Sequence, residues 1–254
     1  MTRYQEHAWP LLTGPTASGK SSLALALAER TGGAIVSFDA MQVYRGMDIG
    51  TAKASQQEQA EIPHYLLDIS DPTTRFTVRN WYDETVVVLE RLKAKQQLPI
   101  GVGGTPQYVT AMIEGVLPGA WPEDLELRQA LAQEAEQAGE EGWRRLHERL
   151  QAVDPAKADR LHPNDHKRVL RALEVFELTG KPLSELAREE EAKREVHYPF
   201  QAFAIRWERA QLYERINQRV NQMMEEGLLD EVQALYRPLA EEEAPLYSTA
   251  RQAI

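Results

Sequence analysis

The segment from Gly14 to Ser21 constrains the fold more than any other part of the chain. Its sequence, Gly-Pro-Thr-Ala-Ser-Gly-Lys-Ser, matches the pattern G-x-x-x-x-G-K-[ST] of phosphate-binding loops (P-loops). An apolar run at residues 8–12 precedes the loop and predicts a strand, and an Ala- and Leu-rich run at residues 22–29 follows it and predicts a helix. Together they place backbone N–H groups and a helix N-terminus around a bound phosphate. The pattern therefore predicts a diphosphate site beside a parallel sheet.

Every residue of this loop is a candidate ligand of the diphosphate. The set consists of Gly14, Pro15, Thr16, Ala17, Ser18, Gly19, Lys20 and Ser21. Lys20 adds a full positive charge, and the Ser21 hydroxyl is an oxygen ligand of the kind that Mg²⁺ takes beside substrate phosphates. We therefore expect Mg²⁺ as cofactor, with Ser21 as a metal ligand.

Composition excludes several other classes of site. The 254 residues include no cysteine, which excludes disulfides, thiolate zinc sites and cysteine nucleophiles. No apolar stretch reaches membrane-spanning length, and residues 1–10 lack the cationic start and long apolar stretch of a secretion signal. We expect a cytoplasmic protein with no membrane partner.

The order of the expected elements predicts two domains. Residues 8–118 alternate strand and helix, with strands at 34–38 and 99–102 and helices within 76–97 and after Gly104. Long charged helical segments without a strand signal follow, and then a strand at 200–205 and a helix at about 209–226. This order predicts an α/β fold, a P-loop NTPase-like parallel sheet flanked by helices. The sheet domain would comprise residues 1–118 and 196–254, with an all-helical insertion at 119–195.

A local basic patch lies inside this acidic chain. The net charge is -10, yet residues 160–171 carry four Lys or Arg against one Asp. On a helical wheel with Lys167 at 0°, Arg171 lies at about 40° and Arg168 at about 100°, opposite the apolar residues. The patch is either a solvated helix face or a surface for nucleic-acid phosphates.

Two side chains follow strand ends and are therefore candidates for chemistry. Asp39 comes directly after the strand at 34–38, where a carboxylate faces the ligand crevice of a parallel sheet. It can act as a general base, a Mg²⁺ ligand or a helix cap. Thr105 follows the strand at 99–102 and two glycines, and it either approaches a ligand or caps the next helix.

Arg215 and Arg219 lie four residues apart on the helix expected at 209–226. Arg219 lies at the edge of the apolar stripe of this helix, from which an arginine can reach into the crevice and hold a diphosphate. The alternative for both residues is a surface ion pair with Glu208, Glu225 or Glu226.

The segment from Asp39 to Lys53, Asp-Ala-Met-Gln-Val-Tyr-Arg-Gly-Met-Asp-Ile-Gly-Thr-Ala-Lys, resembles the most distinctive stretch of the tRNA dimethylallyltransferases. Further resemblances follow in the family's order over nearly the whole chain. They are Pro63-His64, Leu66–Asp68, Gly103–Thr105, His162–Asp165, Arg168, Arg171–Glu174, Arg215 and Arg219. The last four residues, 251–254, resemble the start of a motif that continues further in relatives.

The resemblance implies an enzyme that transfers a dimethylallyl group from dimethylallyl diphosphate to N6 of adenine 37 of tRNA, just 3′ of the anticodon. It implies Asp39 as the base, Thr105 in the channel where the substrates meet, Lys20 at the leaving diphosphate and Arg219 as a further diphosphate ligand. It implies contacts with the anticodon stem-loop of tRNA from Asp39, Ala40, Met41, Gln42, Thr105, Arg128, Lys167, Arg168, Val169, Leu170 and Arg171. We expect the chain to act as a monomer.

Other functions fit parts of the pattern. A P-loop kinase of a small metabolite would share the loop, Mg²⁺ and the parallel sheet. A prenyltransferase that acts on a free adenine nucleotide would share the donor as well. A non-catalytic binding module would not need the intact Lys20, Ser21 and Asp39. The substrate assignment therefore depends on the ordered motifs rather than on the loop.

Overall fold

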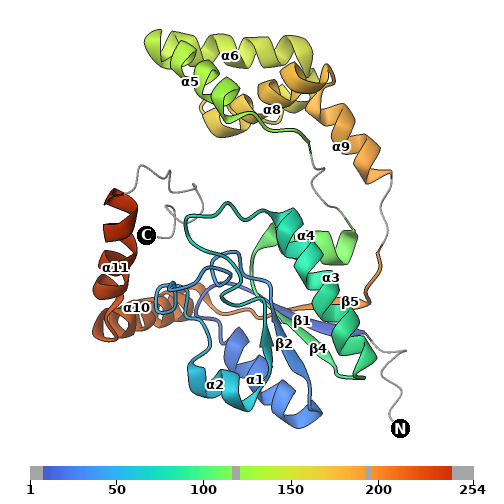
Figure 1. Cartoon of the computed structure of the whole chain (residues 1–254), viewed down its shortest axis with the longest axis vertical. Coiled ribbons are helices and arrows are strands. Elements are labelled where there is room, and N and C mark those ends of the chain that lie inside the picture. The colour runs from blue at the N-terminus through green and yellow to red at the C-terminus, as the bar shows by residue number, and fades with distance from the viewer. Residues whose placement is uncertain (1–7, 116–120, 193–195, 242–254) are drawn as a thin grey trace. The chain divides into compact units, whose positions relative to one another are not determined.

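The computed structural model describes residues 8–115, 121–192 and 196–241, and the chain divides into two compact units (Figure 1). One comprises residues 1–115 and 195–254 and is called the sheet unit; the other comprises residues 116–194 and is called the helical unit. The predicted boundaries at 118–119 and 195–196 fall in or beside segments outside the described residues, as does the motif at 251–254.

The sheet unit is built on five parallel strands. They are β1 (Trp9–Thr13), β2 (Ala34–Ser37), β3 (His64–Tyr65), β4 (Pro99–Val102) and β5 (Phe200–Ala204), in the order β3-β2-β4-β1-β5. The predicted α/β class with a parallel sheet is confirmed. Strand β3 was not expected from the sequence, because two residues are too few to establish an alternation of polar and apolar side chains.

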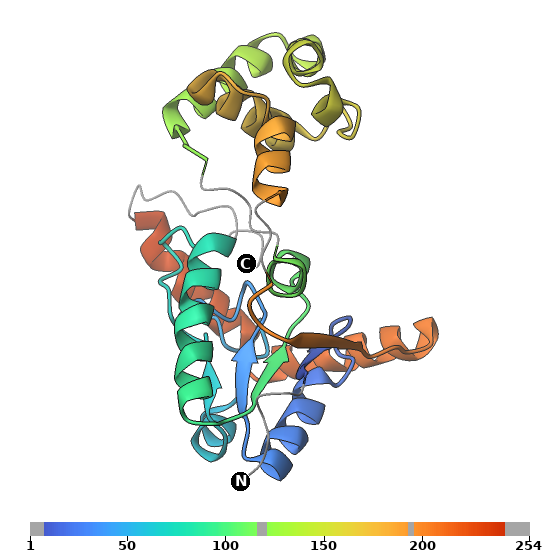
Figure 2. The same ribbon diagram turned by 90° about the vertical axis from the view of Figure 1, so that its right-hand side faces the viewer.

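Helices cover both faces of this sheet. The helices of the sheet unit are α1 (Lys20–Thr31), α2 (Gln56–Glu61), α3 (Val78–Ala94), α4 (Pro106–Glu114), α10 (Arg209–Glu225) and α11 (Leu228–Glu241). Figure 2 shows α1 and α3 on opposite sides of the strands. On the α1 side the buried cluster consists of Leu12, Ala24, Ala28, Ile35, Ile100 and Val102. In the described parts of the chain, no helix is both long and apolar enough to cross a membrane.

Aromatic side chains fill the other face, beneath α3 and α4. Trp81 stacks on Tyr108 at 4.0 Å between ring centroids and meets Phe38 edge-on at 4.8 Å. The Trp81 indole donates a buried hydrogen bond of 3.1 Å to the carbonyl of Ser37. Because this bond pairs the buried indole N–H with the carbonyl of the last residue of β2, it fixes the end of the strand that leads into Asp39.

The described part of the helical unit contains only helices, as expected from the sequence. They are α5 (Leu125–Gln137), α6 (Glu140–Val153), α7 (Pro155–Ala158), α8 (His166–Thr179) and α9 (Leu183–Glu191). These helices have a hydrophobic core of their own. Its buried members are Leu131, Ala135, Leu146, Leu150, Ala158, Val169, Leu170, Ala172, Leu173, Val175 and Leu183.

A buried carboxylate organises this unit. The Glu174 side chain is fully buried and accepts hydrogen bonds from Arg128 at 2.7 Å, from Arg171 at 2.8 Å and from the amide of Asp124 at 2.7 Å. Arg171 also donates to the carbonyls of Trp121 and Pro122. Burial acts to raise the pKa of Glu174, but the hydrogen bonds from Arg171, Asp124 and Arg128 outweigh it and hold the pKa below its ordinary value.

We expect Glu174→Gln to destabilise the helical unit by about 3–5 kcal/mol, because it leaves two half-buried guanidinium groups without their shared carboxylate. Urea unfolding, combined with hydrogen exchange of the amides in α5 and α8, measures the change. Glu177→Gln is the matched control. Glu177 lies on the same helix as Glu174 and forms a more exposed ion pair with Arg149 of α6. Loss of this pair should cost at most about 1 kcal/mol.

The same network sets a pH dependence. Because the pKa of Glu174 is lower in the folded chain, its stabilising contribution is complete above the unfolded-chain pKa of about 4.3. It is lost as the pH falls through the lower folded-state value. Equal acid sensitivity of the wild type and Glu174→Gln would contradict this assignment.

Candidate functional site

A pocket of about 1170 Å³ opens at the carboxyl ends of β1, β2 and β4. In this position parallel α/β sheets bind their ligands. Its walls are the P-loop, the group Asp39, Met41 and Gln42, residues 50–54, residues 103–106 and one side of α10. All these residues belong to the sheet unit. We call it the P-loop pocket.

The P-loop joins β1 to α1, as predicted, and its lysine is held inside the loop. The Lys20 ammonium donates to the carbonyls of Gly14 at 2.9 Å and Pro15 at 2.7 Å. The pKa of Lys20 is lowered, chiefly by burial and also by the charge of Arg219, although Asp39 acts to raise it. Two cations close enough to oppose each other's charge favour a ligand with several negative charges.

Ser18 supplies a further polar group to the loop. Its side chain is buried, and Ser18 Oγ has no hydrogen-bond partner among the described residues. A buried hydroxyl without a partner costs about 1–3 kcal/mol. Since Ser18 also lines the P-loop pocket, a bound phosphate oxygen can accept this hydrogen bond.

Arg215 supports the P-loop from α10. Its Nε donates to the carbonyl of Ala17 at 2.8 Å, and its guanidinium lies 4.4 Å from the ring centroid of Trp207. The Trp207 indole donates to the carbonyl of Ser18 at 2.9 Å. Arg215 and Trp207 therefore hold consecutive loop carbonyls, in place of the surface ion pair that was the alternative for Arg215.

Arg219 lies one turn further along α10 and lines the pocket. Its pKa is lowered by burial, while Asp39 acts to raise it. Arg219 therefore interacts electrostatically with Asp39 and Lys20, which line the same pocket. Both arginines line the pocket, and Arg215 in addition uses its Nε to hold the loop.

The ends of β2 and β4 approach each other closely beside this group of charges. A Cβ atom on Gly103 would lie 2.2 Å from the carbonyl oxygen of Phe38, so only glycine permits the contact. The Thr105 amide donates to the same carbonyl at 3.2 Å, and the Thr105 hydroxyl accepts from the Ala40 amide at 2.9 Å. Thr105 occupies the N-cap position of α4, but its hydroxyl makes no capping hydrogen bond. The helix-cap alternative for this side chain is therefore wrong.

Asp39 and its neighbours form the wall opposite the loop. Asp39 Oδ1 accepts a hydrogen bond of 2.8 Å from the Met41 amide, which orients the carboxyl group. This bond closes a tight turn rather than capping a helix. Ala40, Met41 and Gln42 are half-buried, and Met41 and Gln42 line the pocket.

Gln42 has a role that sequence reasoning missed. Ser37 donates to its Oε1 at 2.9 Å, and its Nε2 donates to the carbonyls of Thr51 at 3.2 Å and Ala52 at 3.3 Å. Lys53 ends the same segment with its side chain 2% exposed, paired with Asp48 and Asp68 at 2.6 Å each. These two residues hold residues 48–53 against the sheet. Their place in the Asp39–Lys53 motif was the only signal for them.

The structure separates the predicted tRNA contacts of the helical unit into three groups. Val169 is 1% exposed and Leu170 8%, so their side chains belong to the core of the unit, and their contact with tRNA stays a prediction. Arg128 and Arg171 are half-buried partners of Glu174. Lys167 and Arg168 are exposed, and Arg168 is paired with Asp165.

The residues of the P-loop pocket fit Mg²⁺ only if a bound diphosphate supplies further oxygen ligands. Ser21 is exposed at the start of α1 and lines the pocket, as a P-loop metal ligand must. Among the described residues, no three His, Cys, Asp or Glu side chains group as metal ligands. Mg²⁺ commonly takes one or two protein oxygens and completes its shell with substrate phosphates and water. The donor set fits a metal that is carried largely by a diphosphate.

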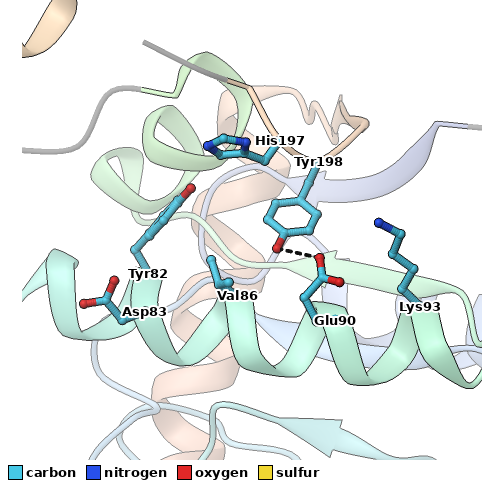
Figure 3. A pocket seen from close by; sticks show the side chains of 7 residues that line it. All are labelled: Tyr82, Asp83, Val86, Glu90, Lys93, His197 and Tyr198. Carbon is cyan, nitrogen blue, oxygen red and sulfur yellow. Dashed lines mark hydrogen bonds between the residues drawn. The ribbon is translucent and has the colours of Figure 1, made fainter. Parts of the chain in front are cut away.

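A second pocket, of about 580 Å³, lies between α3 and residues 197–198 (Figure 3). It shares no lining residue with the P-loop pocket. Tyr198 donates to Glu90 at 3.0 Å and stacks on Trp9 at 5.7 Å between ring centroids. These contacts fasten the start of β5 to α3. The wall of this second pocket carries charges of both signs, from Asp83, Glu90 and Lys93.

Comparison with known proteins gives a consistent result. The sequence model of the IPP transferase family matches residues 42–254, and that of the isopentenyl transferase family matches residues 8–70. The tRNA dimethylallyltransferase of Geobacter sulfurreducens is 48% identical over 225 residues, which are 89% of this chain and 71% of that protein. The enzyme of the same name from Geobacillus thermodenitrificans is 45% identical over 226 residues, covering 89% and 70%.

Solved structures agree with these matches. A full-length tRNA isopentenylpyrophosphate transferase from Bacillus halodurans is 36% identical, with a TM-score of 0.58 over 98% of this chain and 79% of that one. A eukaryotic dimethylallyltransferase acting on tRNA is 27% identical, with a TM-score of 0.75 over 94% and 58%.

The different positions of Arg215 and Arg219 lead to a test with inorganic pyrophosphate. Arg219→Ala should weaken pyrophosphate binding by about 1.5–3 kcal/mol, the usual contribution of a hydrogen bond to a charged group, and leave the unfolding free energy near the wild-type value. Arg215→Ala should lower both quantities, because it also releases the loop. Calorimetric titration and urea unfolding measure them.

Arg209→Ala serves as the control for this pair. Arg209 is an exposed arginine on the same helix, over the ring of Tyr213, and does not line the P-loop pocket. Its loss should change neither quantity appreciably. If Arg219→Ala destabilises the fold as much as Arg215→Ala, the two arginines do not have the separate roles described.

Proposed function

Because the chain belongs to the tRNA dimethylallyltransferase family, we propose that its P-loop pocket carries out the transfer of a dimethylallyl group to tRNA. The donor is dimethylallyl diphosphate and the acceptor is N6 of adenine 37. One observation carries the proposal: Lys20 and Arg219, which suit a diphosphate, line the same pocket as the Asp39 carboxylate. Since all these groups come from one chain, the monomer is the proposed active unit.

The leaving group requires the positive side of the pocket. The bond between the allylic carbon and the diphosphate oxygen breaks, and the diphosphate departs with the electron pair. Negative charge therefore grows on the oxygens beside the loop amides, Lys20 and Arg219, which stabilise it more in the transition state than in the ground state. Lys20 exchanges its bonds to the carbonyls of Gly14 and Pro15 for bonds to the diphosphate. Ser18 donates its unused hydroxyl hydrogen.

The acceptor requires the opposite wall. N6 of adenine forms the new bond to the allylic carbon, and its proton passes to the Asp39 carboxylate. The Met41 amide fixes the orientation of this carboxylate. The Thr105 hydroxyl accepts from Ala40, and its hydrogen is available to an adenine nitrogen. Asp39 is thus the general base, and Thr105 helps to place the adenine.

Mg²⁺ fits the same proposal, with oxygens of the diphosphate and the Ser21 hydroxyl as its ligands. When bound, it neutralises part of the charge on the departing diphosphate. Ser21 holds its position at the first turn of α1, next to Lys20.

The exposure of the side chains in the predicted basic patch indicates which of them can contact tRNA. Lys167 and Arg168 are the members of the predicted patch that present their side chains to solvent. We infer that they bind phosphates of the anticodon stem-loop, while Asp39, Met41 and Thr105 contact the target nucleotide. Glu174 balances part of the positive charge of Arg128 and Arg171, so these two arginines attract tRNA phosphates less than independent cations would.

The decisive experiment is mass spectrometry of unmodified tRNA after incubation with the protein, Mg²⁺ and dimethylallyl diphosphate. The expected product carries one added prenyl group on adenine 37. An adenine nucleotide in place of tRNA tests the free-nucleotide alternative, and ATP with candidate metabolites tests a kinase. Family membership supports neither alternative, so no product is expected in these two reactions.

Asp39→Asn should lower the rate of transfer by about 10² to 10⁴, the usual contribution of a general base. Asparagine keeps an oxygen for the Met41 amide, so the turn survives, and binding of pyrophosphate with Mg²⁺ should stay near the wild-type value. Single-turnover rates and calorimetric titration measure the two effects. Loss of Mg²⁺-dependent pyrophosphate affinity with a normal single-turnover rate would instead make Asp39 a metal ligand.

Replacement of Lys167 and Arg168 by alanine should weaken tRNA binding and spare pyrophosphate binding. Because two cations that bind tRNA phosphates are removed, the slope of log affinity against log salt should become shallower by about 1.4 to 1.8. Arg171 is left in place because it supports Glu174. The control is the double replacement of Arg144 and Arg145, two exposed arginines of α6, which makes the same change in net charge. Identical salt slopes for the wild type and the Lys167/Arg168 variant would exclude the patch from the tRNA surface.

A further inference from the structure

One carboxylate outside the P-loop pocket collects three backbone hydrogen bonds from a loop that lines it. Glu231, in the first turn of α11, accepts from the amide of Asp48 at 2.8 Å, of Ile49 at 2.7 Å and of Gly50 at 2.9 Å. Three consecutive N–H groups directed at one carboxylate form a strong charge-assisted contact. Nothing in the proposed chemistry uses Glu231.

The loop held by Glu231 is the outer part of the wall of the P-loop pocket. Gly50, Thr51, Ala52 and Lys53 line the pocket. Gln42 and Lys53 hold residues 48–53 from the inner side, at the end of β2 and beneath the loop. Glu231 holds the same residues from the outer side. The loop therefore lies between the sheet and α11.

The helix that carries Glu231 continues from the helix that carries Arg219. Gly227, with φ of 100°, makes the turn between α10 and α11. Close packing accompanies the hydrogen bonds: a Cβ atom on Gly50 would lie 3.2 Å from Leu228, and one on Gly46 would lie 3.5 Å from Leu235. The loop glycines thus leave room for the leucines of α11. This hairpin and the loop are two walls of one pocket.

The placement of α10 depends on few contacts. No residue of α10 is buried, and its apolar residues Leu212, Ile216 and Met223 are only half-buried, so polar contacts are important for its position. At the start of the hairpin, Trp207 and Arg215 bind the P-loop carbonyls. At its far end, Glu231 binds loop 48–50. Arg219 lies between these two attachments and relies on both for its distance from Lys20.

We propose that Glu231 is a positioning residue for the transfer reaction: it fastens the α10–α11 hairpin to residues 48–50 and thereby holds Arg219 at the diphosphate. This inference rests on the proposed function for the identity of the ligand. Its structural content, a latch between two walls of the pocket, is tested without turnover. Glu231 touches no substrate and acts through Arg219.

The test uses Glu231→Gln, with Asp230→Asn as the matched control. Both remove one negative charge from the first turn of α11, so they alter the helix-terminus electrostatics alike. Only Glu231→Gln replaces an acceptor oxygen with an NH₂ group that faces amide donors. It should weaken binding of Mg²⁺-pyrophosphate about tenfold and speed hydrogen exchange at residues 48–50. Asp230→Asn should do neither, and tRNA affinity should be unchanged in both.

A double-variant cycle identifies the route. In an Arg219→Ala background, Glu231→Gln should cause no further loss of pyrophosphate affinity, because the group that it positions is gone. Glu231→Asp keeps the charge but withdraws the carboxylate by one methylene, and it should weaken binding like Glu231→Gln. This variant also serves if Glu231→Gln fails to fold.

Three outcomes overturn the proposal. They are equal loss of affinity in Glu231→Gln and Asp230→Asn, additive losses from Glu231→Gln and Arg219→Ala, and faster exchange at residues 48–50 without loss of pyrophosphate affinity. Failure of the wild type to modify tRNA would overturn the proposed function instead. It would leave the pyrophosphate measurements, and hence the test of the latch, intact.

Discussion

The approach of β4 to the backbone of Phe38 is the contact on which the P-loop pocket depends. Because Gly103 has no side chain, the β4 end lies against the β2 end, and Thr105 exchanges hydrogen bonds with Phe38 and Ala40. Trp81 fixes the last carbonyl of β2 from the opposite face. The position of Asp39 relative to the P-loop is therefore set by backbone contacts between adjacent strands, which are among the most rigid elements available.

The walls of the pocket are held in two different ways. Strand ends place Asp39 and Thr105, whereas α10 and residues 48–53 are held by polar side chains: Arg215, Gln42, Lys53 and Glu231. Under the proposed function, the groups that act on adenine lie on strand ends, where their geometry is fixed, and the walls beside the diphosphate are held by side chains.

Sequence reasoning predicted the P-loop, the parallel sheet, the helical insertion and the group formed by Lys20, Asp39 and Thr105, because each has a local pattern. It did not predict what long-range contacts decide. On a helical wheel Arg171 lies beside Lys167, but Glu174 draws it into the protein and leaves Lys167 outside. The sequence around Glu231 does not indicate that it binds residues 48–50, and the sequence around Trp207 does not indicate that it binds the P-loop. The periodicity of the helix correctly places Val169 and Leu170 in the core, whereas their membership of a segment used by relatives does not distinguish buried from exposed side chains.

Trp207 gives the P-loop an optical property of its own. The indole of Trp207, one of five tryptophans in the chain, is hydrogen-bonded to the P-loop carbonyl of Ser18. It also lies against the Arg215 guanidinium, which holds the neighbouring carbonyl of Ala17. Indole emission responds to both kinds of neighbour. A rearrangement of the loop that moves Ser18 or Arg215 therefore changes the fluorescence of Trp207. The difference in emission between the wild type and Trp207→Phe would therefore report occupancy of the loop, without a label and with the buried Trp81 left in place.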